Sequence, residues 1–137
     1  MNIIFQKENF SVKKEIDSFS NSNRNSGSIM SFLGKVRPLN ENREIKSIDI
    51  EFYEKMAFYQ TKKIVFNLLK ECSINDYTII HRYGNLVPGE NIVLVLVASK
   101  HRRESFIFLE SIIDWLKKKI TFWKKENYLT SSKWIEQ

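Results

Sequence analysis

Lysines near the end of the chain are the side chains best suited to chemistry. One cationic run lies at residues 117–119, and Lys124 and Lys125 form a second run shortly after it. Neighbouring positive charge and burial lower the pKa of a lysine, which makes its neutral amine available as a base or nucleophile near neutral pH. We expect the Phe-Trp pair at residues 122–123 to dock on the core as an anchor and to return Lys124 beside Lys117.

Two other cationic points suit the binding of an anion. Arg37 ends a strand pattern just before a loop, and its planar guanidinium presents a fork of donors that suits phosphate or carboxylate. His101 and Arg102 stand where a strand pattern gives way to a helix, whose first N–H groups are free to bind an anion. Because a helix of about 17 residues is about 25 Å long, its two ends cannot contact the same small molecule unless another segment folds back.

The two histidines and the single cysteine give weaker indications. His81 lies inside a strand pattern, where a packed or hydrogen-bonded histidine is commoner than a catalytic base. His101 is more open to a functional role, although neither histidine has an adjacent Ser, Cys or Asp in a nucleophile motif. Cys72 lies within a helical pattern and is expected to be a small core residue.

Composition excludes several classes of function. The chain has 137 residues and is 42% hydrophobic, which predicts one folded domain over residues 1–137. A single Cys cannot form an internal disulfide, and one Cys with two His cannot supply the four ligands of the usual structural zinc site. The glycines at positions 27, 34, 84 and 89 cannot form a GxGxxG or Walker A loop. The longest apolar run, at residues 92–98, is far shorter than the ~20 residues of a membrane span. The lone Cys72 suits a reducing cytoplasm, where we expect the protein.

The net charge of +6 leaves a nucleic-acid-binding module without catalysis as one alternative, because a basic surface attracts polyanions. The excess is uneven along the chain. Residues 98–137 hold 9 basic and 5 acidic side chains, so this segment alone carries a net charge of 9 − 5 = +4. The other interpretation of the excess is an ordinary solvated surface rich in lysine.

Strand and helix patterns succeed one another as in a compact α+β domain. Strands are predicted at 3–5, 29–36, 48–53, 77–83 and 92–98, and helices at 12–19, 54–72 and 103–119. We expect a mostly antiparallel sheet packed by two longer helices and one short helix. The last two strands should form a hairpin, residues 18–28 a loop, and residues 121–137 a segment that packs back over the sheet. The last helix should bury a stripe of four residues: Phe106, Leu109, Ile113 and Leu116.

Several short blocks stand in a fixed order over residues 27–134. They are Gly27 with FLGKVR at 32–37, EFY at 51–53 with MA at 56–57, HRYGNL at 81–86, SKHR at 99–102 with Phe106, DWLK at 114–117 and FWKKE at 122–126. Each block is unremarkable alone, but the set is highly specific. On these residues the chain resembles the family of the large, catalytic subunit of molybdopterin synthase.

The resemblance implies a sulfurtransferase of molybdenum cofactor biosynthesis. Such a subunit converts cyclic pyranopterin monophosphate to molybdopterin by installing two sulfurs as a dithiolene. The sulfur arrives as a thiocarboxylate on the C-terminal Gly-Gly tail of a small ubiquitin-like partner subunit. The implied assembly is a homodimer of large subunits within a heterotetramer, and the transfer itself requires no metal and no organic cofactor. Neither a membrane nor a nucleic acid is an expected partner.

The resemblance also implies roles for particular residues. Lys117 would be the catalytic base or transient nucleophile, and Lys124 would orient the tail or assist proton transfer. The implied substrate-binding residues are Lys35, Val36, Arg37, His101, Arg102, Lys125 and Glu126. The precursor and the tail are both anionic, so positive charge already in place would stabilise the intermediate formed on the thiocarboxylate.

The chain also departs from the family at several points. Thr121 stands where a proline is frequent, and Lys133 stands where an arginine is common. Residues 39–44 follow no recognisable pattern, and residues 1–26 match only loosely. A non-catalytic relative that merely holds a partner is a third alternative, and the retained Lys117 and Lys124 argue against it.

Overall fold

The structure, a computed structural model, describes residues 1–118, 123–129 and 132–135. The described helices are α1 (Val12–Ser22), α2 (Glu54–Glu71) and α3 (Arg102–Lys118). The described strands are β1 (Asn2–Gln6), β2 (Ser28–Lys35), β3 (Leu39–Asn40), β4 (Arg43–Glu51), β5 (Asp76–Arg82), β6 (Gly84–Leu86), β7 (Asn91–Ser99), β8 (Trp123–Tyr128) and β9 (Ser132–Ile135). The predicted α+β class, with mostly antiparallel strands, two longer helices and one short helix, is confirmed.

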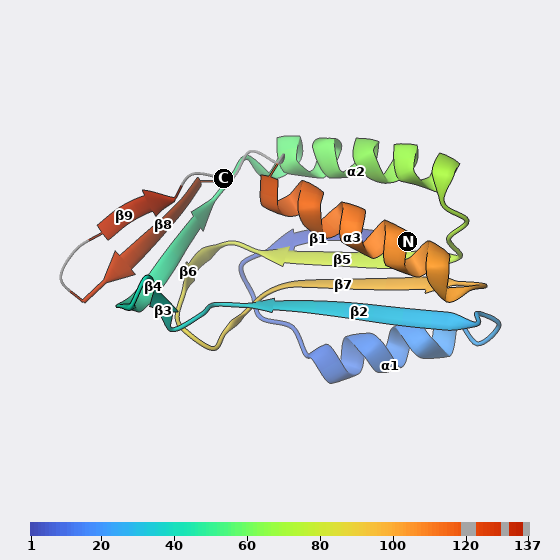
Figure 1. The fold of residues 1–137 in the computed structure, drawn as a ribbon, viewed down its shortest axis with the longest axis horizontal. Helices are drawn as coiled ribbons and strands as arrows, with labels where there is room; N and C mark the ends of the chain where they lie inside the picture. The colour runs from blue at the N-terminus through green and yellow to red at the C-terminus, as the bar shows by residue number, and fades with distance from the viewer. Residues whose placement is uncertain (119–122, 130–131, 136–137) are drawn as a thin grey trace.

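The larger layer is a sheet in the order β1-β5-β7-β2, in which only the β1–β5 pair is parallel. Helices α2 and α3 cover one face of this sheet and α1 covers the other (Figure 1). The central strand β7 is therefore buried on both faces, and every residue from Leu94 to Ser99 is buried. This burial explains why the sequence there is a continuous apolar run without alternation.

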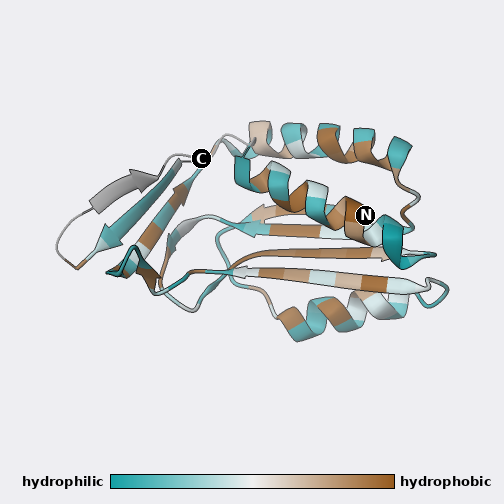
Figure 2. Ribbon diagram, viewed as in Figure 1, coloured by the Kyte–Doolittle hydropathy of each residue, from teal (hydrophilic) through white to brown (hydrophobic). Residues whose placement is uncertain are grey.

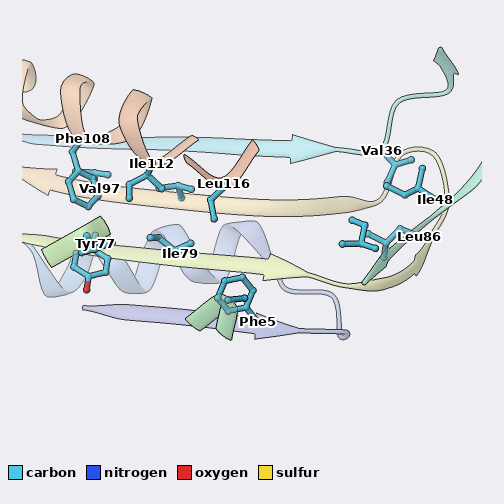
Figure 3. Packing of buried hydrophobic residues seen from close by; sticks show 14 of the residues in the cluster. Phe5, Val36, Ile48, Tyr77, Ile79, Leu86, Val97, Phe108, Ile112 and Leu116 are labelled. Atoms are coloured by element: carbon cyan, nitrogen blue, oxygen red, sulfur yellow. The ribbon is translucent and has the colours of Figure 1, made fainter. Parts of the chain in front are cut away.

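Helix α3 packs on the sheet through Phe108, Ile112 and Leu116, which meet Val97 and other β-strand residues in the main core (Figure 3). Of the predicted stripe, Leu116 is buried as expected and Leu109 is half-buried, but Phe106 is 58% exposed, so the buried face is partly displaced around the helix. Both sets of residues follow helical spacing, and only the position of the sheet selects between them. Helix α2 similarly buries Ala57, Thr61, Val65 and Leu68. The hydropathy view shows apolar and polar residues interleaved along both helices (Figure 2).

Helix α1 extends further than its apolar pattern indicates. The Ser11 side chain caps its start by accepting a hydrogen bond from the backbone N–H of Lys14. At the other end, the Asn23 side chain donates to the carbonyl oxygen of Phe19. Residues 18–28 were expected to be a loop throughout, but the helix continues to Ser22, so the loop is shorter.

A second sheet lies beyond the C-terminal end of α3 (Figure 1). It has the order β3-β4-β8-β9, with β6 also paired to β4. The predicted hairpin of β5 and β7 is present, but the short strand β6 lies in its connection and joins the second sheet. The expectation that the C-terminal segment packs over the main sheet was wrong for its described part, because β8 instead pairs edge-on with β4.

Residues 39–44 form a tight hairpin of β3 and the start of β4. Asn40 pairs with Arg43, and the two residues between them have positive φ values, 52° at Glu41 and 65° at Asn42. A two-residue loop with both φ values positive matches the twist of the flanking strands. The sequence signal is weak because this turn has no glycine.

Candidate functional site

A cavity of about 590 Å³ lies where the two sheets meet the end of α3. Its volume is in the range of small-molecule sites. The main sheet contributes residues of β2, β5 and β7, the second sheet contributes residues of β4 and β8, and α3 contributes its last turns. The lining consists of Phe32, Gly34, Lys35, Val36, Arg37, Ile45, Ile48, His81, Ile92, Val93, Val95, Ile113, Leu116, Lys117, Lys118, Lys124 and Glu126.

Cationic side chains reach this cavity from three segments. Lys117 and Lys118 come from the last turn of α3, Lys124 comes from β8, and Lys35 and Arg37 come from the end of β2 and the residues after it. The negative end of the helix dipole favours cations at the first of these places. The structure thus brings Lys117, Lys124 and Arg37 together, as the sequence led us to expect.

The charge state of Lys124 is shifted by its surroundings. Burial is the largest cause that lowers the pKa of the Lys124 amine, and the nearby charges of Lys117 and Arg37 lower it further. Glu126 acts in the opposite direction and raises the pKa. The net effect is a pKa below the ordinary value of a lysine, which increases the fraction of neutral amine at neutral pH.

Glu126 is the acidic side chain of the cavity lining, and it is buried. One of its oxygens, Oε1, lies 3.8 Å from Nη2 of Arg37. The other oxygen, Oε2, accepts hydrogen bonds from the Tyr128 hydroxyl at 2.5 Å and from Nδ2 of Asn40 at 3.0 Å. A buried carboxylate needs such partners because desolvation of the charge is unfavourable.

His81 lines the cavity from β5, and its ring is buried. Burial lowers the pKa of His81 to about 3, and the charge of Lys124 lowers it as well. The imidazole is therefore neutral at pH 7, and Nδ1 lies 2.8 Å from the carbonyl oxygen of Arg82, to which it donates. The ring also packs against Phe5 and Phe52, so His81 is the packed, hydrogen-bonded histidine that its strand pattern predicts.

Comparison with known proteins assigns the family. The sequence matches the family described as MoaE protein over residues 5–119, which is most of the chain. The chain belongs to this family. The resemblance inferred from the sequence blocks is thereby confirmed.

Relatives of this MoaE family member carry an enzyme name. A "molybdopterin synthase catalytic subunit" from Pyrococcus abyssi is 37% identical and aligns with 99% of this chain and 90% of its own length. Another with the same name, from Brucella melitensis, is 34% identical over 98% of this chain and 83% of its own.

Solved structures of MoaE proteins have the same fold. A molybdopterin biosynthesis MoaE protein from Burkholderia ambifaria superposes with a TM-score of 0.82 at 29% identity, over 98% of this chain and 89% of that one. A complex of subunits 1 and 2 of molybdopterin-converting factor from Helicobacter pylori contains a chain with a TM-score of 0.80 at 16% identity, covering 98% of this chain and 90% of that one.

Two of the residues singled out in this MoaE family member lie far from the cavity within one chain. His101 directly precedes α3 and Arg102 begins it, whereas Lys117 lies in the last turn. A helix of this length separates its ends by about 25 Å. The hydroxyl of Ser99 donates to the carbonyl oxygen of His101 at 2.6 Å, and a Cβ on Gly27 would lie 2.2 Å from the carbonyl oxygen of Lys100, so this corner is tightly packed. The expectation of one pocket is therefore not met for His101 and Arg102 in a single chain.

Lys125 does not line the cavity either. Successive side chains of a strand point to opposite faces, so Lys125 lies on the far side of β8 from Lys124. It pairs in register with Asp49 of β4, and its charge helps to lower the pKa of that carboxyl, after hydrogen bonds from Asn127 and Asn85. The structure thus places Lys125 apart from the cavity residues with which the resemblance grouped it, because the two faces of this strand were not predicted.

Trp123 is 45% exposed and meets the exposed Tyr53 ring edge-on, with 6.1 Å between ring centroids. The prediction that it anchors the core was wrong, and the other aromatic of the pair, Phe122, lies outside the described residues.

Sequence reasoning also missed Lys118 and His81 as cavity residues. The sequence does contain a signal for Lys118, because this lysine belongs to the same cationic run as Lys117.

Among the described residues, no helix is long and apolar enough to cross a membrane. Nor does any group of three or more His, Cys, Asp and Glu side chains in the described ranges have an arrangement that could hold a metal ion.

Proposed function

We propose that this MoaE family member is the catalytic subunit of a molybdopterin synthase. It transfers sulfur from the thiocarboxylated C-terminus of a small ubiquitin-like subunit to cyclic pyranopterin monophosphate, which yields molybdopterin. The observation that carries the proposal is the convergence of Lys117, Lys124 and Arg37 on one cavity. Relatives that are 34–37% identical over almost the whole chain bear the name of this enzyme.

The cavity chemistry fits two anionic reactants. Arg37 is suited to hold the phosphate or a carboxylate through its planar fork, and Lys35, Lys117 and Lys118 add positive charge. Lys117 acts as base or transient nucleophile at the thiocarboxylate and the pterin carbons. Lys124, whose amine has a lowered pKa, orients the tail or moves a proton. Preorganised positive charge stabilises the oxyanion that develops on the tail carbonyl during transfer.

A second copy of the chain gives His101 and Arg102 a role in substrate binding. In a two-fold symmetric pair whose axis is perpendicular to neighbouring α3 helices, the two helices run antiparallel, and the N-terminal end of one lies beside the C-terminal end of the other. His101 and Arg102 of the second copy then approach the cavity that contains Lys117. We propose a homodimer on this basis, with one sulfur-carrier subunit for each large subunit. The H. pylori complex of two subunits is consistent with such a partner.

We propose that residues 1–137 form a single domain. We also propose that the protein is located in the cytoplasm. Its single cysteine, Cys72, is a free, buried thiol, as suits a reducing compartment. The localisation of a tagged chain in a cell fractionation experiment tests the compartment directly.

The nucleic-acid alternative has one observation in its favour, which is the exposed pair of Tyr53 and Trp123 beside the cationic segment. Aromatic rings on an exposed face can stack on bases. Five of the described cations, however, line one cavity of about 590 Å³, which suits a small anion better than an extended polymer: Lys35, Arg37, Lys117, Lys118 and Lys124. We therefore favour the enzyme, and tight RNA or DNA binding at physiological salt would reverse this order.

Reconstitution tests the proposed function. Purified chain, thiocarboxylated carrier and cyclic pyranopterin monophosphate should give molybdopterin, and Lys117→Ala should lose nearly all of this activity while its thermal unfolding stays close to wild type. Lys14→Ala is the matched control, because Lys14 lies on α1, on the opposite face of the main sheet. Normal turnover by Lys117→Ala would contradict the assigned role of this lysine.

A further inference from the structure

The hairpin at residues 39–44 contacts β8, the strand that carries Lys124 and Glu126 of the cavity. Asn40 and Arg43, which flank its two-residue turn, both reach Tyr128 at the end of β8. The guanidinium carbon of Arg43 lies 3.9 Å from the centre of the Tyr128 ring, and Nδ2 of Asn40 lies 3.3 Å from the Tyr128 hydroxyl. The hairpin thus contacts both the ring and the hydroxyl of one tyrosine.

Tyr128 and Asn40 share a target in Glu126. The Tyr128 hydroxyl donates to Oε2 of Glu126 at 2.5 Å, and Asn40 donates to the same oxygen at 3.0 Å. The hydrogen bond to Glu126 is the largest cause of a raised Tyr128 pKa, which keeps the phenol protonated as a donor. Two neutral donors on one oxygen fix the rotation of the carboxylate, so its other oxygen, Oε1, is directed to Arg37.

Arg37 needs a fixed carboxylate as its partner because the Arg37 side chain is 65% exposed, whereas that of Glu126 is buried. An exposed arginine loses conformational entropy when it binds an anion, and a fixed carboxylate reduces that loss. Neither Asn40 nor Tyr128 belongs to the cavity lining, so neither contacts a ligand there directly.

We propose that Asn40 and Tyr128 are positioning residues, which hold Glu126 so that it keeps Arg37 over the cavity for the anionic substrate. This inference rests on the proposed function for the identity of the substrate. It assigns a role to the hairpin, whose sequence follows no recognisable pattern.

Kinetics of single and double variants test this inference. Tyr128→Phe removes only the hydroxyl and keeps the ring against Arg43, and it should raise the KM for cyclic pyranopterin monophosphate roughly threefold to tenfold with little change in kcat. Asn40→Ala, in a hairpin outside the core, should also raise this KM. It replaces Tyr128→Phe as the test variant if Tyr128→Phe fails to fold. Tyr59→Phe, on the exposed face of α2, is the matched control and should leave KM unchanged.

The double variant separates positioning from general structural support. If Tyr128 acts through Glu126, adding Tyr128→Phe to Glu126→Gln should change KM by less than about twofold, because the coupled carboxylate is already lost. An additive effect, or an unchanged KM in both Tyr128→Phe and Asn40→Ala, would overturn the inference.

Inorganic phosphate distinguishes this inference from the proposed function. Its binding, measured by titration calorimetry, requires no turnover. Weaker phosphate binding by Tyr128→Phe but not by Tyr59→Phe would support the positioning role even if wild type produced no molybdopterin, in which case the proposed function fails alone. Equal phosphate binding by all three proteins would overturn the positioning role.

Discussion

Lys124 and Lys125 are adjacent in the chain but lie on opposite faces of β8. Lys124 pairs with the fully buried Ile50 and lines the cavity, whereas Lys125 pairs with Asp49 on the other face. Cross-strand partners share a face of a sheet, so the pairing register separates the two lysines. Two chemically identical side chains therefore have different surroundings.

This separation predicts different effects of the same substitution. Lys124→Ala should lower kcat for molybdopterin formation by at least about a hundredfold, because it removes the amine with the lowered pKa from the cavity. Lys125→Ala should keep activity within about threefold of wild type. Turnover with purified carrier and substrate measures both variants, and a similar large loss in both would contradict the assigned faces.

Complementation between defective chains tests the proposed homodimer. Lys117→Ala and His101→Ala should each be inactive alone, but a mixed dimer has one site that combines an intact Lys117 with an intact His101 of the second copy. Random pairing of equal amounts makes half of the dimers mixed, each with one intact site of two, so activity should recover to about a quarter of wild type. Absence of recovery, when mixed dimers are shown to form by tag purification, would contradict a shared site.

The buried His81 predicts a loss of stability in mild acid. Its pKa is about 3 in the folded chain, below the ordinary histidine value of 6.5. Between these values the unfolded chain binds a proton that the folded chain does not, so stability falls as pH decreases from 6.5 towards 3. The slope from this group is up to about 1.4 kcal/mol per pH unit.

Denaturant unfolding at pH 7 and pH 5 measures this effect. Wild type should lose about 2 kcal/mol more than His81→Gln over that interval, since the other titrating groups are common to both proteins. His101→Gln is the matched control for removing a histidine, because the His101 side chain is exposed. An equal pH dependence in wild type and His81→Gln would contradict the buried, neutral state of His81.

Local patterns predicted the helices and main strands well, because apolar periodicity reports directly on burial. The apolar run at residues 92–98 predicts a strand, and the structure has β7 there, buried between helices on both faces of the sheet. On α3, Leu116 is buried as predicted, but Phe108 and Ile112 are buried in place of Leu109 and Ile113, because neighbouring stripes of that helix are both apolar. The pairing of β6 and β8 with β4 depends on contacts between distant segments, for which the sequence has no local signal.

The sequence by itself determined the family, the α+β class and the residue types of the site. Its ordered blocks are specific, and Lys117, Lys124 and Arg37 were identified from them. Tertiary structure decided which of these residues meet. The length of α3 places His101 far from Lys117, the register of β4 with β8 turns Lys125 away from the cavity, and the 39–44 hairpin brings Asn40 to Glu126. The physical reason is that residue type fixes the chemistry of a side chain, whereas its neighbours in a site depend on pairing and packing between segments far apart in the chain.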